Sequence, residues 1–263
     1  MKIACIGAAH FDVKAKLLVP FKAKSSHPVT SFFSTGGVIR NVAENLARLS
    51  LNVQLVSRVG ADARGSDLLQ AMRELGIDVS CTSQSSTQPT ATYTAVLDSQ
   101  GELIIGLADM EIYDEVNPSL LGGIDKEAPY WFVDSSFSVE TLRWICLNRP
   151  KKTKLWAMAI SPTKVVRWKS LLSHLDLLFL NRYELERLVD VKGDDLHSAA
   201  ALLVENGPQA VIVTEGEKGA FVCRRGGHLF SLEAHPVHVV DVTGAGDALA
   251  AGTLFGVIQG FSI

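Results

Sequence analysis

A carboxylate stands directly beside a glycine turn near the end of the chain, in the stretch Asp241-Val-Thr-Gly-Ala-Gly-Asp247. The sequence predicts a strand before this turn and a helix after it. Backbone amides without partners then point out of the helix N-terminus and attract anions, and Gly244 and Gly246 let a ligand approach the main chain. The turn lacks the Gly-Lys-Ser/Thr of a P-loop and the third glycine of a dinucleotide-binding turn. The stretch therefore predicts an anion site of another kind.

Asp247 makes this turn unusual, because a carboxylate opposes plain phosphate binding. The charge makes sense if Asp247 takes the proton of a hydroxyl group while that hydroxyl attacks a phosphoryl group. The amides of Gly244, Ala245 and Gly246 would then stabilise the charge that develops on the transferred group. The alternative is an ordinary first-turn aspartate that the helix dipole favours.

Composition excludes several classes of protein. The 263 residues carry 25 Lys+Arg against 28 Asp+Glu, and no long run of like charges occurs, which argues against nucleic-acid or membrane-surface partners. Hydrophobic residues make up 47%, enough for a buried core, and no apolar stretch reaches the length of a membrane helix. The four cysteines are scattered and fit neither a metal motif nor a disulfide framework. We therefore expect a cytoplasmic protein.

Short apolar runs alternate with segments of helical periodicity along the chain. This alternation predicts an α/β fold with a mainly parallel central sheet and helices on both faces. We expect strands near 2–6, 53–56, 130–133, 155–160, 177–180 and 210–214, and helices near 38–49, 66–75, 139–147, 164–173, 183–188, 196–205 and 248–259.

Two segments, about 14–33 and 89–106, break this alternation. They are rich in β-formers and contain turn residues, so they predict a small second β-sheet that projects from the core of a single domain over 1–263. Two ordinary surface hairpins are the alternative. An exposed strand edge often pairs with another copy, which makes a homodimer through this sheet an expectation as well. The stretch 82–88 is expected to be a loop.

Four motifs occur in a fixed order along the chain. They are the segment 36–49, which begins Gly-Gly-Val-Ile-Arg-Asn, Asn-Arg-Tyr-Glu at 181–184, Thr-Glu-Gly-Glu-Lys-Gly at 214–219 and the turn at 241–247. Together they resemble the signatures of the PfkB carbohydrate kinases, the ribokinase-like superfamily. The resemblance implies a ribokinase-like fold, a β-sheet lid and an ATP-dependent kinase of sugars or nucleosides.

Within this family, three features are most similar to the pseudouridine kinases: Arg40 before the asparagine, the segment around Asp109-Met110, and Val242 in the glycine turn. This similarity implies phosphorylation of the 5′-hydroxyl of pseudouridine to pseudouridine 5′-phosphate. Ribokinase-like, adenosine kinase-like and other nucleoside kinase activities remain alternatives.

The resemblance also implies roles for residues in the first part of the chain. Asp12 would accept hydrogen bonds from ribose hydroxyls, and a turn-forming aspartate is the alternative. Asp109 and Thr92 would reach the base or the ribose, although each also fits an ordinary loop or strand position. The residues expected to bind substrate are Asp12, Gly36, Gly37, Asn41, Asp109 and Thr92.

The nucleotide and its metal would occupy the later motifs. Asn181 and Glu184 would orient Mg²⁺ through its waters, unless they only cap a helix. Thr214, Gly216 and Gly219 would contact the nucleotide phosphates, unless they form a turn without a ligand. The residues expected to bind the cofactor are Asn181, Thr214, Gly216 and Gly219, and those expected to hold metal are Glu184 for Mg²⁺ and Asp241 and Thr243 for a monovalent cation such as K⁺.

Two departures from the family pattern bear on activity. Ser161-Pro162 stands where the family often has Asp-Pro, which removes one acid near the metal. The chain ends at Ile263, 16 residues after Asp247, whereas family members continue through helices that wall the adenine pocket. We therefore expect a domain truncated at its C-terminus, with Leu254 and Phe261 among the residues left without partners. A catalytically impaired nucleoside-binding protein is the second functional hypothesis.

Overall fold

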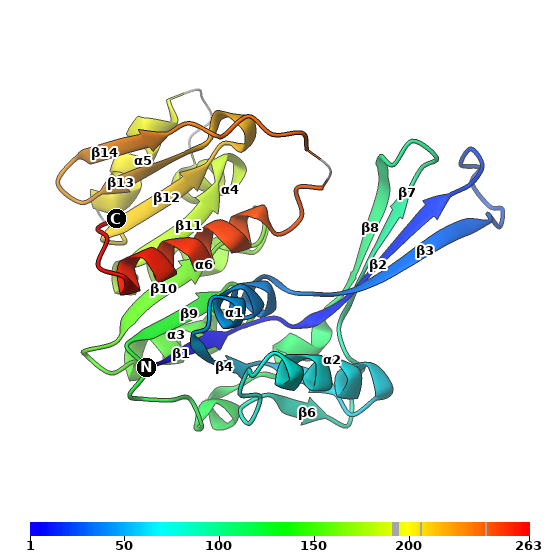
Figure 1. The fold of residues 1–263 in the computed structure, drawn as a ribbon, viewed down its shortest axis with the longest axis horizontal. Helices are drawn as coiled ribbons and strands as arrows, with labels where there is room; N and C mark the ends of the chain where they lie inside the picture. Colours follow the sequence, from blue (N-terminus) through cyan, green and yellow to red (C-terminus); the bar gives the residue numbers. More distant parts are fainter. Residues whose placement is uncertain (191–194, 206, 240) are drawn as a thin grey trace.

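A computed structural model describes residues 1–190, 195–205, 207–239 and 241–263. Its central sheet has eight strands in the order β14-β13-β12-β11-β10-β9-β1-β4 (Figure 1). All neighbours from β12 to β4 pair in parallel, while β13 and β14 continue the sheet antiparallel. The expected mainly parallel sheet is confirmed. The strands are β1 (Lys2–Ile6), β4 (Asn52–Val56), β9 (Tyr130–Asp134), β10 (Lys154–Met158), β11 (Leu177–Asn181), β12 (Ala210–Thr214), β13 (Ala220–Arg224) and β14 (His228–Leu232).

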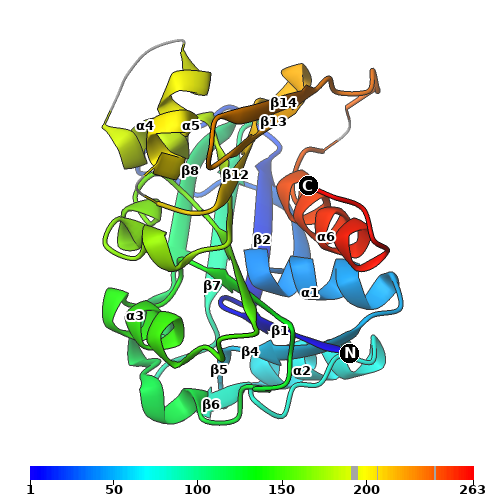
Figure 2. The same ribbon diagram turned by 90° about the vertical axis from the view of Figure 1, so that its left-hand side faces the viewer.

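Helices cover both faces of this sheet, and alternate strand residues supply the two cores (Figure 2). Helices α1 (Val38–Arg48), α2 (Ala63–Glu74) and α6 (Ala245–Ile258) cover one face, and α3 (Val139–Asn148), α4 (Arg182–Val189) and α5 (Leu196–Glu205) cover the other. In β1, Ala4 and Ile6 pack into one core and Ile3 and Cys5 into the other. Within the described residues no helix is long and apolar enough to cross a membrane.

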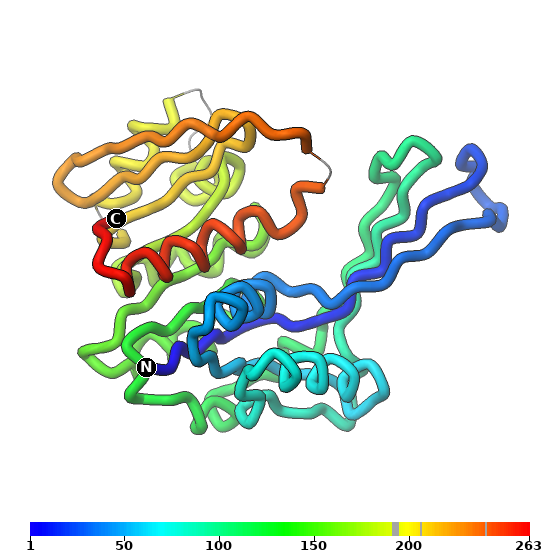
Figure 3. Tube along the Cα trace, viewed as in Figure 1, coloured from blue at the N-terminus to red at the C-terminus, as the bar shows by residue number. Residues whose placement is uncertain are grey.

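A four-stranded second sheet projects from one corner of the molecule, as the sequence predicts (Figures 1 and 3). Its strands are β3 (Val29–Gly36), β2 (His10–Leu17), β7 (Thr92–Leu97) and β8 (Leu103–Asp109), in that order. Strand β2 follows β1 after the short break Gly7–Ala9, so the two sheets meet at the carboxyl end of β1. This junction lies between β1 and β9, where the chain switches direction across the sheet and where open α/β sheets bind ligands.

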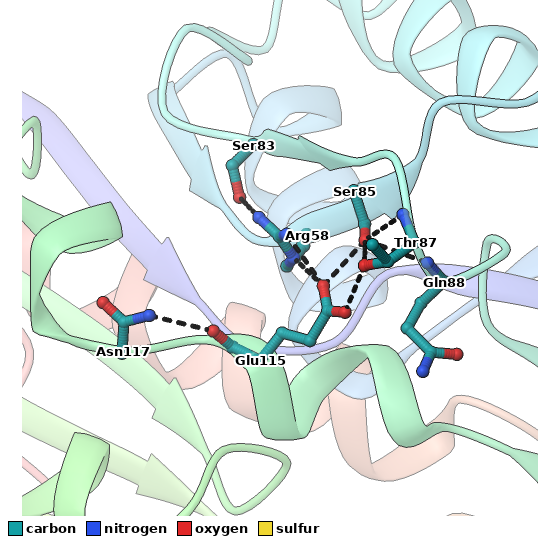
Figure 4. Close-up of polar contacts among 7 residues, drawn as sticks. All are labelled: Arg58, Ser83, Ser85, Thr87, Gln88, Glu115 and Asn117. Atoms are coloured by element: carbon teal, nitrogen blue, oxygen red, sulfur yellow. Dashed lines mark hydrogen bonds and ion pairs between the residues drawn. The ribbon is translucent and has the colours of Figure 1, made fainter.

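The stretch expected as a loop at 82–88 contains a short strand, β6 (Ser83–Ser85), which pairs in parallel with β5 (Arg58–Gly60). Figure 4 shows how a carboxylate fastens this ribbon to the turn after β8. Glu115 accepts hydrogen bonds from Arg58 Nη2 at 2.7 Å, Ser85 Oγ at 2.7 Å and Thr87 Oγ1 at 2.6 Å. Two hydroxyl groups of the stretch, those of Ser85 and Thr87, therefore bind Glu115.

The helix expected over 164–173 is instead a pair of 3₁₀ turns, Val165–Trp168 and Leu172–His174. The physical reason is the spacing of its apolar residues: Val165, Trp168 and Leu171 are all fully buried, at intervals of three. Three residues per turn is the repeat of a 3₁₀ helix, and an α-helix would rotate these side chains apart.

Helix α6 begins at Ala245, three residues earlier than expected, because the glycine turn leads straight into it. Leu254 is fully buried against the α1 side of the core, so the expectation that it lacks partners is wrong. Phe261, after the helix, is exposed as expected.

Candidate functional site

A cavity of 600 Å³ opens where the two sheets meet, and we call it the junction cavity. Five parts of the chain line it: β2, the start of α1, β7 with the end of β8, the loops after β9 and β10, and the turn before α6. Of the residues expected to act on substrate, Asp12, Gly37, Asn41, Gly244 and Asp247 all line this cavity. Residues that are more than 200 positions apart in sequence, Asn41 and Asp247, are joined by a hydrogen bond.

Gly36 and Gly37 let β3 and α1 approach the loop after β1 closely. A Cβ atom at Gly36 would collide with the carboxyl group of Asp12, and one at Gly37 would collide with the carbonyl oxygen of Ala8. Gly37 also has a φ of 105°, which side chains rarely adopt. The two glycines therefore bring Asp12 and the first turn of α1 together.

Thr92 and Asp109 lie on the opposite face of the second sheet, away from the junction cavity. They are paired across β7 and β8 and, together with Arg64, line a separate hollow of 520 Å³. Arg64 Nη1 donates to Thr92 Oγ1 at 3.2 Å.

 Side chains alternate along a strand, so Tyr93 and Ala108 face the junction cavity instead. The structure therefore does not bring Thr92 and Asp109 together with Asp12.

Several lining residues were missed by sequence reasoning. His10, Tyr93, Ser136 and Lys164 all line the junction cavity. His10 Nε2 lies 3.2 Å from Asp12 Oδ1, and the hydroxyl group of Ser136 is buried without a hydrogen-bond partner in the described chain. The alternation along β7 marks Tyr93 only as opposite to Thr92, and Ser136 and Lys164 stand in loops whose sequence carries no motif.

Asp247 lies in the first turn of α6 and is only 7% exposed. Its Oδ2 accepts a hydrogen bond from Asn41 Nδ2 at 2.7 Å. Burial raises the pKa of Asp247 to about 6, and the hydrogen bond from Asn41 opposes that rise. The carboxyl group is therefore ionised at neutral pH but is a stronger base than an exposed aspartate.

The glycine turn presents open amides, but the Ala245 amide, which the sequence suggested as one of them, is not open. Gly244 caps α6 with a φ of 79°, and the Ala245 amide donates to the carbonyl oxygen of Val242 at 3.1 Å. The Ala245 amide is therefore engaged in the turn. The amides of Gly244, Gly246 and Asp247 donate to no acceptor in the described residues, so they remain available to an anion.

A second cavity, of 990 Å³, lies on the other side of this turn, and we call it the turn cavity. It brings together all four residues expected to bind the cofactor, Asn181, Thr214, Gly216 and Gly219. Ala245 and Gly246 at the start of α6 line it as well. The start of α6 thus stands between the two cavities, with Gly244 and Asp247 on the junction side.

Asn181 and Glu184 form a reciprocal cap at the start of α4. Asn181 Oδ1 accepts from the Glu184 amide at 3.1 Å, and Glu184 Oε2 accepts from the Asn181 amide at 2.8 Å. Glu184 is 3% exposed, and burial raises its pKa to about 7. It also lines a small hollow of 170 Å³ with Thr214, Gly246 and Asp247, so this capping carboxyl group lies close to the turn.

Asp241 and Thr243 lie apart from Glu184. The Asp241 carboxyl group is exposed, accepts from the Thr243 amide at 2.8 Å and pairs with Lys14 Nζ of β2 at 2.8 Å, and these contacts lower its pKa. Over the described ranges no group of three or more His, Cys, Asp or Glu side chains is arranged to hold a metal ion. Neither expected metal position, Glu184 for Mg²⁺ or Asp241 with Thr243 for a monovalent cation, therefore belongs to such a group.

Comparison with known proteins places this architecture in one family. The pfkB family of carbohydrate kinases matches residues 1–263. The chain is 29% identical to pseudouridine kinase from Escherichia coli, over 95% of this chain and 82% of the relative, and 30% identical to guanosine-inosine kinase from Exiguobacterium acetylicum, over 96% and 86%. A carbohydrate kinase from Agrobacterium tumefaciens superposes with a TM-score of 0.84 at 30% identity, over 99% of this chain and 85% of that one. The chain belongs to the pfkB family of carbohydrate kinases and is an ATP-dependent kinase.

Proposed function

We propose that this kinase transfers a phosphoryl group from ATP to the 5′-hydroxyl of a ribonucleoside, and that pseudouridine is its acceptor. One observation carries the proposal: Asp247, a buried carboxylate beside open backbone amides, shares the junction cavity with Asp12 and Asn41. A base, an anion site and a polyol-binding carboxylate are thus within one cavity, which is the arrangement that phosphoryl transfer to an alcohol needs.

The acceptor would lie in the junction cavity with its ribose hydroxyls on Asp12. Charge-assisted hydrogen bonds from paired hydroxyls to a carboxylate are short and strong, and His10 holds the Asp12 carboxylate from its other side. Asn41 has a second amide proton that can be donated to the ribose. These contacts would direct the 5′-hydroxyl towards Asp247, which has only one oxygen engaged by Asn41.

Asp247 would accept the proton of the 5′-hydroxyl as the oxygen attacks the terminal phosphorus of ATP. The pKa of about 6 suits this role, because the group is ionised at neutral pH and still has a useful affinity for a proton. The amides of Gly246 and Asp247 would stabilise the charge on the phosphoryl group in flight. Positioning and electrostatics, rather than covalent intermediates, account for such catalysis.

The nucleotide would occupy the turn cavity, whose 990 Å³ is lined by Asn181, Thr214, Gly216 and Gly219. Glu184 fits a role with Mg²⁺, because one of its oxygens is free of the capping bond and the buried group faces the hollow beside Asp247. Bound there with ATP, the metal would supply positive charge that neutralises the phosphates. Glu184 would contact its waters.

A monovalent cation at Asp241 and Thr243 is not supported. The Asp241 carboxyl group is paired with Lys14 and with the Thr243 amide, so its charge is already compensated. We therefore assign no step to K⁺.

The choice of a nucleoside over free ribose rests on further lining residues of the junction cavity. Ser161, Thr163 and Lys164 supply hydrogen-bond donors, and Tyr93 and Met110 supply apolar surface. A planar base that carries carbonyl oxygens can use both kinds of contact. The 29% identity to a pseudouridine kinase agrees with this choice, while the 30% identity to a guanosine-inosine kinase favours purine nucleosides as the second candidate.

A phosphate-transfer screen tests the proposal. The 263-residue chain is incubated with ATP and Mg²⁺ and with pseudouridine, uridine, inosine, guanosine, adenosine, ribose or fructose, and the phosphorylated products are identified by mass spectrometry. We expect pseudouridine to have the highest kcat/KM. A preference for ribose or fructose contradicts the nucleoside assignment, and calorimetric binding of nucleoside without transfer supports the alternative of an impaired nucleoside-binding protein.

We also propose that two copies associate through the second sheet and that the protein acts in the cytoplasm. The outer face of this sheet, turned away from the junction cavity, exposes Phe33 by 70% and Leu107 by 51% in one row across the sheet. Such apolar side chains are favourable to bury against a second copy. All four cysteines are free thiols, which agrees with a reducing compartment.

A further inference from the structure

Arg40 is a buried cation next to the proposed site, and the proposed chemistry gives it no task. Its side chain is 7% exposed, although arginine is seldom buried to this degree. Nη1 donates to the carbonyl oxygen of Thr35 at 3.2 Å and to Asn41 Oδ1 at 2.6 Å, and Nη2 donates to Glu44 one helical turn further on. The guanidinium group thus joins the end of β3 to two side chains of α1.

These contacts determine how the Asn41 amide is turned. An asparagine side chain has an oxygen that accepts and a nitrogen that donates, and the two ends have nearly the same shape. Here the oxygen faces Arg40, which can only donate, and the nitrogen faces the carboxylate of Asp247, which can only accept when ionised. The reversed amide would place two donors and then two acceptors against each other, so Arg40 and Asp247 together enforce one orientation.

We propose that Arg40 is a positioning residue for phosphoryl transfer: through the Asn41 amide it fixes the Asp247 carboxyl group, so that Oδ2 is engaged and Oδ1 meets the acceptor hydroxyl. This inference rests on the proposed function. Arginine suits the task, because its planar fork reaches three acceptors at once and remains charged when buried. Lysine presents a single ammonium group and cannot span the same three acceptors.

The surroundings of Arg40 indicate that this side chain contributes little to the stability of the folded state. Its Nε is buried without a hydrogen-bond partner among the described residues, which is unfavourable for folding. Glu44 does not depend on Arg40 for a counter-charge, because Arg48 donates to Glu44 Oε1 from Nε at 2.9 Å and from Nη2 at 2.7 Å. An apolar side chain of similar volume is often tolerated where a charge is buried.

Nuclear magnetic resonance tests the amide orientation without any use of activity. Protein labelled with ¹⁵N at asparagine carries a side-chain signal for Asn41, identified by its loss in Asn41→Asp. We expect this signal to move towards that of an exposed asparagine in Arg40→Met, because the amide is no longer held. Arg48→Met, which removes the other arginine on Glu44, is the control and should leave the signal in place. An Asn41 signal that is the same in Arg40→Met and in the parent overturns the inference.

Steady-state kinetics then test the consequence. We expect kcat to fall about 10- to 100-fold in Arg40→Met, with the melting temperature unchanged and Arg48→Met close to the parent. Equal kcat values in Arg40→Met and Arg48→Met contradict the role. If Arg40→Met does not fold, Arg40→Lys replaces it as the test, since lysine keeps the charge but lacks the planar fork. A kcat of Arg40→Lys equal to that of the parent then contradicts the role of Arg40. A parent chain without transfer activity refutes the proposed function. The resonance experiment tests the effect of Arg40 on the Asn41 amide independently of that result.

Discussion

At the scale of single residues, burial makes Asp247 a base. Water is excluded from the carboxyl group, which raises its pKa to about 6, and only Asn41 among the described residues donates a hydrogen bond to it. The same burial has a cost, because a charged group without full solvation destabilises the folded state. Replacing the Asp247 carboxylate by a neutral group should therefore lower the activity and raise the stability of the folded state.

The first prediction concerns pH. Because Asp247 must be ionised to accept a proton, kcat/KM of the parent should fall as pH decreases through about 6, its raised pKa. The folded state binds this proton more tightly than the unfolded chain does, so the contribution of Asp247 to stability falls as pH rises from its ordinary range towards about 6. A pH–rate profile that is flat down to about pH 4.5 contradicts the assignment.

The second prediction follows from the unfavourable burial of the Asp247 charge. At neutral pH, Asp247→Asn removes a buried charge and should raise the melting temperature, which differential scanning fluorimetry measures. The gain should disappear in acid, where the parent carboxyl group is protonated as well. A variant that is less stable than the parent at neutral pH contradicts the view that desolvation dominates at this residue.

At the scale of elements, the strand ends and helix starts place the functional groups. Strand β1 ends at Ile6, the chain turns through Gly7–Ala9 into β2, and α1 starts right behind this loop at Val38. The Ala8 carbonyl oxygen accepts from the Arg40 amide at 3.3 Å, so the loop and the helix are joined directly. Gly37 permits this approach, since a Cβ atom there would collide with Ala8.

The third prediction tests the close packing of α1 against the loop after β1. Gly37→Ala should destabilise the fold by about 1–3 kcal/mol, because the residue has a positive φ and no room for a methyl group. Gly252→Ala in the middle of α6 is the matched control, since no atom lies near its Cβ position, and it should be neutral or stabilising by about 0.5–1 kcal/mol. Chemical denaturation measures both. Equal stabilities for the two variants would show that α1 does not pack closely against the loop after β1.

Elements also separate what the sequence can predict from what it cannot. Apolar runs and motif order were enough for the parallel sheet and the helix after the glycine turn, because these depend on local pattern. They also selected Asp12, Asn41 and Asp247, which the structure brings to one cavity, because ligands bind at the edge where parallel strands end. The face of β7 was not determined, because alternation marks Thr92 and Tyr93 as opposite without saying which one faces the cavity. The use of the Ala245 amide within its own turn depends on backbone torsions that the residue types do not specify.

At the scale of the whole molecule, the second sheet has two different faces. Asp12 and Tyr93 point into the junction cavity from one face, while Phe33 and Leu107 are exposed on the other. The pair of Lys14 on this sheet with Asp241 before α6 joins its inner face to the glycine turn. An exposed pair of this kind contributes at most about 1 kcal/mol, so it orients the sheet rather than locking it.

The fourth prediction concerns assembly. Replacing the exposed apolar row, as in Phe33→Ser with Leu107→Ser, should shift the protein from dimer to monomer in sedimentation velocity experiments, because the apolar area that drives association is removed. Leu147→Ser, at an exposed leucine of α3 on the central domain, is the control and should not change the sedimentation coefficient. A parent that sediments as a monomer refutes the proposed dimer.

The most direct test of the central claim is the turnover of Asp247→Asn with its preferred acceptor, measured beside the dissociation constant for that acceptor. Asparagine keeps the shape and the hydrogen bond partner but cannot accept the proton, so kcat should fall by about 10²- to 10⁴-fold while acceptor binding is retained. Turnover within about tenfold of the parent would contradict Asp247 as the base, and with it the mechanism proposed for this kinase.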